Sequence, residues 1–328
     1  MFWFALLGLA VAQDGVEDTG SHGSDAEPVE VAVAPPTQEE LLEEVVALRR
    51  VGAFEDAARM LVRAQSTSGE VDERVAYHAA VLAEVTERWA EAVDGYRAVI
   101  EGWPDSSSAS DAWFRMAYCQ EEMGDHKASI RTVRSLQRQE KWSETDDRSM
   151  ELQRGIAETR AGKTRRGIRR ILRALESGED ERTWIRAKAR LALVRAQTGA
   201  AADIKLKGDA KAARRLKARS GLIASAEKQA IAMFNLGEPE FALEGLLLLG
   251  DAYLSLYHAM LEYPPPRSVP EEQRLIYRST VEEKAAILRT KAHARYDEGV
   301  RVAARTQWVG SVTDRLIAAR ERVAPFVE

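Results

Sequence analysis

A pattern of two helical stripes separated by a helix-ending residue recurs along the first half of this 328-residue chain, at intervals of about 35 residues. The first copy has its stripe and turn residues at Leu41, Val45, Leu48, Gly52, Ala57, Leu61 and Ala64. A stripe at this spacing predicts an amphipathic helix, and the glycine between two stripes predicts a tight turn. Each copy therefore predicts a helical hairpin, and the repetition predicts a stack of hairpins.

Three further copies follow the first. The second starts 35 residues later, with Ala76, Ala80, Ala83, Ala92, Tyr96, Val99 and Pro104. The third starts 37 residues after that, with Trp113, Met116, Ala117, Gly124, Ser129, Val133 and Leu136. The fourth carries Gly155, Gly162, Gly167, Ile171 and Ala174.

These residues resemble the tetratricopeptide repeat family, in which a repeat of 34 residues has small side chains at positions 8 and 20. The small residues here are Ala80, Ala117, Gly155, Ala57, Ala92, Ser129 and Gly167. They allow two helices to cross closely. Val45 stands in place of a small residue, and Glu87 in place of the turn glycine.

The resemblance covers residues 37 to about 174 and is sharpest from Tyr96 to Gly124. That stretch looks like repeats of bacterial envelope proteins of the outer-membrane assembly, Tol-Pal-associated and gliding-motility types. The implied fold is all-α: a tetratricopeptide-type solenoid, a right-handed superhelix of hairpins. We assign residues 37–178 to the repeats, and 179–328 to degenerate helical repeats with a longer-helix C-terminal cap.

The second half predicts longer helices. Trp184, Ala187, Leu191 and Val194 lie on one helix, which the run 199–202 (Gly-Ala-Ala-Ala) is expected to break. A helix pair is expected at 224–236 and 241–261. A capping box at 268–271 predicts the start of one helix of roughly 50 Å. A last helix carries Trp308, Val312 and Leu316.

The first twelve residues form an apolar run that ends in Ala10-Val11-Ala12, which is typical of a signal peptide cleaved before Gln13. Residues 13–36 carry six acidic residues and no Lys or Arg, which predicts a disordered linker. A periplasmic or secreted protein with no transmembrane span is therefore expected. If the segment is not a signal, the chain is cytoplasmic.

The inventory for catalysis is small. One cysteine, Cys119, supports neither a disulfide nor a cysteine-based zinc site within one chain, and a small buried side chain is expected there. Among five histidines, only His258 and His293 have an acidic residue four positions on, at Glu262 and Asp297. No metalloprotease, hydrolase, dinucleotide or P-loop motif is present. We expect no enzyme, no cofactor, no metal and no small-molecule substrate.

Residues 160–219 hold 19 Lys or Arg against six acidic residues, in a chain of net charge -5. Arg165, Arg166, Arg169, Arg170 and Arg173 fall on one helix face. This basic patch is either an anion site for an acidic partner or polyanion, or a solvated face. Charge reversal at Arg166, Arg169 and Arg170 is expected to leave folding intact, because these side chains should lie on a solvated face. Without interleaved aromatic residues, nucleic acid is not the expected ligand.

The resemblance also implies a partner groove lined by positions 2, 5, 9 and 12 of each first helix. Positions 5 and 9 are apolar: Leu42, Tyr77, Phe114, Leu152, Val46, Val81, Tyr118 and Ile156. Positions 2 and 12 form a charged rim: Glu39, Arg74, Asp111, Arg49, Glu84 and Glu121. The alternative is that the apolar residues only pack between first helices. We expect a non-catalytic scaffold or adaptor of the bacterial cell envelope that holds a segment of another protein in this groove.

Overall fold

A computed structural model describes residues 35–68, 72–138, 143–178, 182–207, 211–265 and 269–323. Within these ranges the chain forms thirteen α-helices, one short 3₁₀ helix and no strand, so the predicted all-α fold is confirmed. Thr37–Glu328 form one compact unit. The predicted signal peptide and nearly all of the acidic linker lie outside the described residues. No helix in the described ranges is long and apolar enough to cross a membrane.

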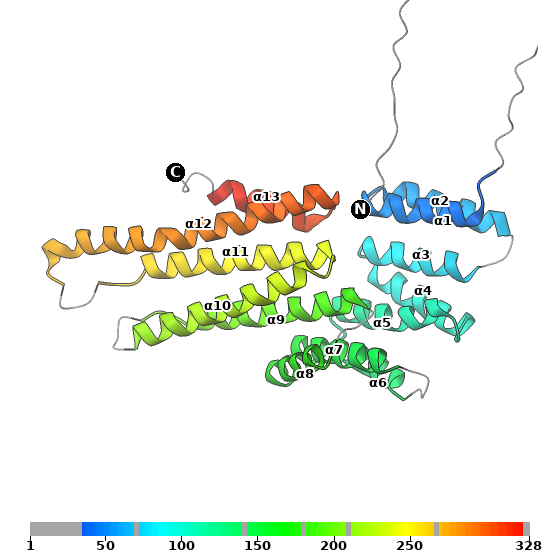
Figure 1. Ribbon diagram of the computed structural model, residues 1–328, viewed down its shortest axis with the longest axis horizontal. Helices are drawn as coiled ribbons and strands as arrows, with labels where there is room; N and C mark the ends of the chain where they lie inside the picture. The colour runs from blue at the N-terminus through cyan, green and yellow to red at the C-terminus, as the bar shows by residue number, and fades with distance from the viewer. Residues whose placement is uncertain are drawn as a thin grey trace, which may run out of the picture. The chain divides into compact units, whose positions relative to one another are not determined.

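The first eight helices form four hairpins, in which each helix packs on the next (Figure 1). They are α1 (Gln38–Arg50), α2 (Phe54–Ser68), α3 (Glu73–Val85), α4 (Trp89–Gly102), α5 (Ser107–Glu122), α6 (His126–Leu136), α7 (Glu144–Arg160) and α8 (Thr164–Glu176). Side-chain oxygens cap the first helix of each hairpin. Thr37, Asp72, Ser106 and Ser143 each accept a hydrogen bond from a backbone N–H of the first turn. The predicted hairpins are confirmed.

The hairpin turns need a left-handed residue. Gly52, Gly124 and Gly162 have φ of +76°, +82° and +80°. Glu87 takes the same place in the second hairpin with φ of +59°. A residue with a β-carbon is disfavoured there, so the missing glycine noticed in the sequence corresponds to a strained turn.

The small residues allow the helices of a hairpin to touch, and all seven are buried. The closest approach is between α7 and α8. A β-carbon added at Gly167 would lie 2.5 Å from the carbonyl oxygen of Gly155. Only a hydrogen atom fits between these two backbones, so glycine is required at that crossing.

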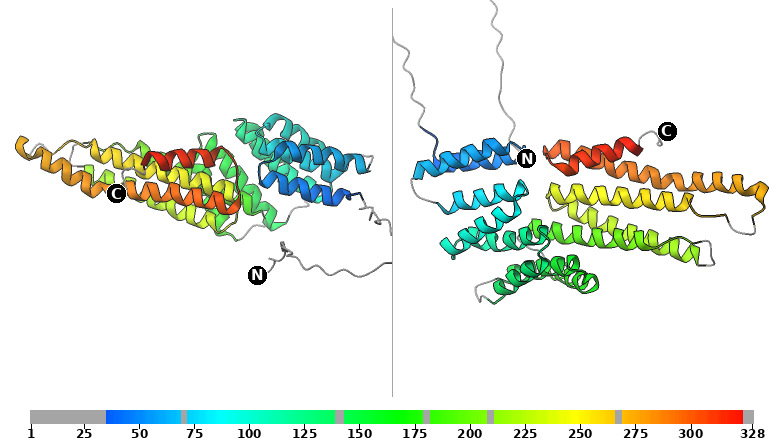
Figure 2. Two further views of the ribbon diagram at one scale, coloured as in Figure 1. Left: turned by 90° about the horizontal axis from the view of Figure 1, so that it is seen from above. Right: turned by 180° about the vertical axis from the view of Figure 1, so that it is seen from behind.

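The remaining helices are longer: α9 (Thr183–Asp203), α10 (Ala212–Phe234), α11 (Pro239–Leu261), α12 (Arg274–Thr306) and α13 (Ser311–Val323), with the 3₁₀ helix η1 (Glu271–Gln273) before α12. α11 and α12 lie side by side along most of their length (Figure 1 and Figure 2). Their contact includes Tyr296, whose ring packs on Gly250 and whose hydroxyl donates to Asp251 at 2.8 Å. The expected cap of longer helices is present.

Three expected boundaries in this half are wrong. α9 continues through Gly199 to Asp203, because one glycine costs only about 1 kcal/mol in a helix and the neighbouring alanines favour it. α10 begins at Ala212, well before the expected start at 224. α12 begins at Arg274 after η1 and has no side-chain cap, while Ser268 of the expected capping box lies outside the described residues.

Candidate functional site: a polar network on the first-helix face

The first helices of successive hairpins, α1, α3, α5 and α7, contact one another, and α9 continues the row after α7. We call the surface that these helices form the first-helix face. It carries a network of charged side chains, most of which are buried or half-buried. The network joins residues that are far apart in the sequence.

Arg115 of α5 is the centre of the network between α3 and α5. Its guanidinium contacts Glu84 at 2.7 Å and Asp111 at 2.6 Å. Tyr96 donates its hydroxyl to Glu84 at 2.6 Å, and Tyr77 donates to Asp111. Burial alone would lower the pKa of Arg115, but the two carboxylates outweigh it and hold that pKa well above its usual value.

The same contacts shift the pKa values of Asp111 and of the nearby Cys119. Burial would raise the pKa of Asp111, but Arg115 and the Tyr77 hydroxyl hold it below the usual value. Burial and the nearby Glu84 raise the pKa of the Cys119 thiol far above its ordinary range. Cys119 is therefore a buried neutral thiol, as the sequence led us to expect.

α9 closes the network from the other side. Arg182, just before α9, pairs with Asp111 and Asp146, and its guanidinium lies 4.3 Å from the centre of the Phe114 ring. Lys188 Nζ lies 3.1 Å from Glu121 and 3.8 Å from the centre of the Tyr118 ring. Two helices of the first-helix face, α5 and α7, are thereby tied to α9 and to the residue before it.

Tyr118 is enclosed by aromatic and charged groups. Its ring meets those of Trp89 and Trp184 in edge-on contacts, with centroids 5.8 and 6.2 Å away. Its hydroxyl donates to Glu240, in the first turn of α11, at 3.5 Å. Burial raises the pKa of Tyr118 well above its usual value.

Residues 111–140, which span most of α5 and all of α6, match the family model described as tetratricopeptide repeat. This chain carries a tetratricopeptide repeat. Arg115, Tyr118 and Glu121 of the network therefore lie on the first helix of that repeat.

The likenesses to solved structures include two that cover most of this chain. One is to a tetratricopeptide repeat protein from Parabacteroides merdae, with 14% identity over 87% of this chain and 98% of that chain, and a TM-score of 0.39. The other is to a circular tandem repeat protein with a novel repeat topology, with 14% identity over 88% of this chain and 63% of that chain, and a TM-score of 0.23. No curated protein matches the chain. At these TM-scores we draw nothing further from the two likenesses.

The tetratricopeptide groove is not the open apolar channel that the sequence suggested. Of the eight apolar groove residues, Val46 and Tyr77 are half-buried and the other six are buried: Leu42, Val81, Phe114, Tyr118, Leu152 and Ile156. Arg182, Trp184 and Lys188 cover Phe114 and Tyr118. These side chains serve packing, which was the alternative interpretation, and partner binding through them stays a prediction.

The expected charged rim of this groove divides into two groups. Glu39 and Arg74 are exposed, and Arg49 and Asp111 are half-buried. Glu84 and Glu121 are buried, so the prediction that they lie on an exposed rim is wrong. A buried carboxylate needs a partner, and here Arg115 and Lys188 supply it.

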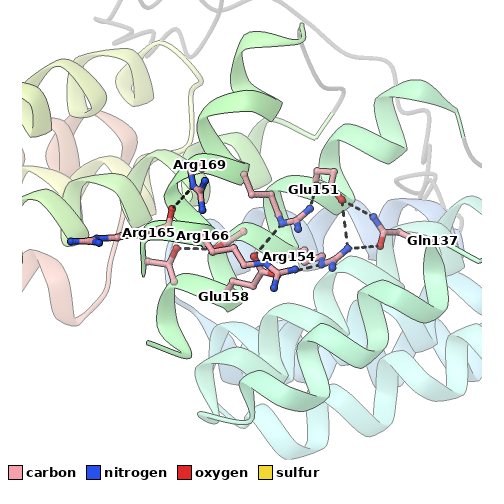
Figure 3. A network of polar contacts seen from close by, with 10 residues as sticks. Gln137, Glu151, Arg154, Glu158, Arg165, Arg166 and Arg169 are labelled. Atoms are coloured by element: carbon pink, nitrogen blue, oxygen red, sulfur yellow. Dashed lines mark hydrogen bonds and ion pairs between the residues drawn. The ribbon is translucent and has the colours of Figure 1, made fainter. Parts of the chain in front are cut away.

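The basic patch beside the tetratricopeptide repeat is also divided (Figure 3). Arg165, Arg169 and Arg173 are exposed. Arg166 contacts the buried Glu158 at 3.2 Å, and Arg170 contacts both Glu158 and Glu151. Only 17% of the Arg170 side chain is exposed, so the expectation that Arg170 lies on a solvated face is wrong.

No group of three His, Cys, Asp or Glu side chains able to hold a metal ion occurs in the part of the chain that the structure describes. Sequence reasoning missed Arg115, Arg182, Lys188 and Glu240 as members of the network. A signal existed in the acidic residues Glu84 and Glu121, which recur at the same repeat position and require buried cations.

Proposed function

We propose that this chain is a non-catalytic protein-interaction scaffold that binds an acidic segment of another protein at the first-helix face of its first two hairpins. The matched tetratricopeptide repeat and the stacked hairpins support a scaffold, because such repeats offer extended surfaces to partners. The site differs from the apolar groove expected at first, since that groove is filled by the chain's own side chains.

The observation that carries this proposal is a half-buried arginine without a carboxylate partner, close to other arginines that are already paired. Arg49, in the last turn of α1, has a buried Nε atom with no hydrogen-bond partner, and no carboxylate of a described residue pairs with it. Burial and the nearby Arg115 lower the pKa of Arg49. Burial, Arg49, Arg74 and Arg115 lower the pKa of His78 to about 4.

Burial is the largest cause of the lowered pKa of His78, and the positive charges of the three arginines add to it. A carboxylate from a partner would offset these positive charges and give the Nε atom of Arg49 the hydrogen bond that it lacks. An acidic side chain or a C-terminal carboxylate has the required charge. The half-buried position of Arg49 adds to the strength of such a contact.

Two labelled twelve-residue peptides, one rich in Glu and one in which Gln replaces each Glu, test this proposal by fluorescence anisotropy. We expect the Glu-rich peptide to bind, and the double variant Arg49→Ala/Arg74→Ala to weaken binding at least tenfold. The matched control is Arg131→Ala/Arg134→Ala, which removes two exposed arginines from α6. Equal binding of both peptides, or equal loss in both double variants, would contradict the proposal.

We also propose that the scaffold acts in the bacterial cell envelope. The apolar run of residues 1–12 and the resemblance of residues 96–124 to envelope repeats support this. N-terminal sequencing of the protein from its native cell tests it. The expected first residue is Gln13, and an intact Met1 on cytosolic material would rule the export out.

A further inference from the structure

A second basic site lies at the junction of α9, α10, α11 and α13. A cavity of about 580 Å³ opens there. Its polar lining includes Lys205 after α9, Arg219 of α10, Ser255 and His258 of α11, and Arg322 of α13. This volume is in the range of small-molecule binding sites.

Arg219 is the unusual member of this lining. Its exposed fraction is 4%, yet no carboxylate among the described residues pairs with it. One terminal nitrogen donates to Ser255 Oγ at 2.8 Å, and Nε is buried with no hydrogen-bond partner. Burial without a counter-ion lowers the pKa of Arg219. A buried guanidinium normally has a carboxylate or another anion beside it.

The other charged residues of the cavity leave a surplus of positive charge. Lys205 and Arg322 are exposed at its edge and carry one positive charge each. Asp251 also lines the cavity, but it already accepts the hydroxyl of Tyr296 at 2.8 Å. Glu262 is the remaining acidic residue and is exposed. Three cations thus face two carboxylates, one of which is engaged.

A neighbouring hollow extends the positive region. It shares Lys205 with the cavity and is also lined by Lys207 and Arg214. A surface of this kind raises the local concentration of anions. An anion that entered the cavity from this side would meet the donors of Arg219 that the protein leaves free.

We propose that this cavity binds the phosphate group of a small phosphorylated molecule. A guanidinium presents parallel N–H donors that match phosphate oxygens, and Lys205 and Arg322 supply the charge that a dianion requires. The volume left beside a phosphate would hold a small organic group, against the apolar side chains of Leu206 and Leu254. Nothing in the proposed scaffold role depends on this site.

Isothermal titration calorimetry on the full chain tests the proposal with three probes at matched ionic strength: inorganic phosphate, glycerol 3-phosphate and sodium chloride. We expect saturable binding of glycerol 3-phosphate and no binding heat from chloride. Tighter binding of inorganic phosphate than of glycerol 3-phosphate would overturn the assignment to an organic phosphate. Vesicles with and without phosphatidic acid form a further arm, and binding to vesicles alone would likewise overturn it.

Arg219→Met is the decisive variant, because methionine keeps an unbranched side chain and removes the charge. We expect it to fold and to weaken glycerol 3-phosphate binding at least tenfold. Arg278→Met, at an exposed position early in α12, is the matched control and should bind like the wild type. Should Arg219→Met fail to fold, Lys205→Met/Arg322→Met takes its place, since both side chains are exposed. Unchanged affinity in the variant that folds would refute the site.

Discussion

Lys188 Nζ lies 3.1 Å from Glu121, and the exposed fractions of the two side chains are 3% and 0%. The pair joins α9 to the first helix of the tetratricopeptide repeat. Without Lys188, the buried Glu121 would keep only Arg160, whose Nε lies 3.6 Å away, and the Gln153 amide, which donates to it at 3.1 Å. We expect Lys188→Met to lower the free energy of unfolding by about 2–3 kcal/mol, measured by urea unfolding followed by circular dichroism.

Two further variants make the Lys188 experiment specific. Lys228→Met removes an exposed lysine from α10 and should change stability by no more than about 0.5 kcal/mol. Adding Glu121→Gln to Lys188→Met should recover part of the loss, because it removes the buried charge that Lys188 had helped to offset. A double variant that is less stable than Lys188→Met alone would contradict this account.

Charge reversal separates the two halves of the basic patch. Arg170→Glu places a third carboxylate beside Glu151 and Glu158, whose exposed fractions are 34% and 3%. We expect a loss of about 3 kcal/mol or more in the free energy of unfolding. Arg165→Glu, on the exposed part of the same helix, should cost no more than about 0.5 kcal/mol. If thermal melts show the same loss of stability in Arg170→Glu and Arg165→Glu, the ion pairs of Arg170 are not formed.

Glu87→Gly should stabilise the second hairpin. The residue has φ of +59°, where a β-carbon costs about 1–2 kcal/mol, and glycine removes that cost while adding freedom to the unfolded chain. We expect a net gain of about 0.5–1 kcal/mol. Glu91→Gly, inside α4, is the comparison and should lower stability by about 1 kcal/mol. A loss of stability in Glu87→Gly would show that its side chain matters more than its backbone.

Two glycine-to-alanine variants should have opposite effects. At Gly167 a β-carbon meets backbone atoms of α7, so alanine forces the helices apart and should destabilise by about 2–3 kcal/mol. At Gly199 a β-carbon meets nothing within 4 Å inside α9, so alanine should stabilise by about 0.5–1 kcal/mol. The melting temperatures of the two variants test this prediction. A change of the same sign in both variants would contradict it.

His78 should make the protein less stable in acid. Its pKa is about 4 in the folded chain, against about 6.5 when unfolded. Between these values the unfolded state binds more protons, so the free energy of unfolding falls as the pH drops from about 6.5 to 4. We expect the free energy of unfolding of His78→Gln to fall by about 1–3 kcal/mol less than that of the wild type over this pH range. If the two curves of unfolding free energy against pH stay parallel, the pKa of His78 is not lowered.

The hairpins could be predicted because their determinants are local. Leu41, Val45 and Gly52 lie within four turns of one another, and stripe and turn together specify two packed helices. Helix ends were less predictable. Gly199 did not end α9, because a helix tolerates a single glycine when its neighbours favour the helix.

The candidate site could not be predicted in the same way. Arg182 meets Asp111 and Lys188 meets Glu121 across about 70 residues, and such pairings depend on how far the stack of hairpins turns. The periodic acidic positions show that buried cations are needed, but they do not identify the helix that supplies them. The aromatic residues Phe114 and Tyr118 fitted a binding groove and a core equally well at the level of sequence.

The tie between α5 and α9 changes how this stack of hairpins should unfold. In a simple repeat array each unit touches only its neighbours, so the ends fray first and stability is a sum of nearest-neighbour terms. Here Arg182 and Lys188 bind carboxylates on a helix two hairpins earlier. Opening of α9 would take one cation from each of Asp111 and Glu121, which would then depend on Arg115 and Arg160 alone. The middle of the array is therefore expected to unfold as one cooperative block, and shortening the chain at residue 178 would destabilise helices far from the cut.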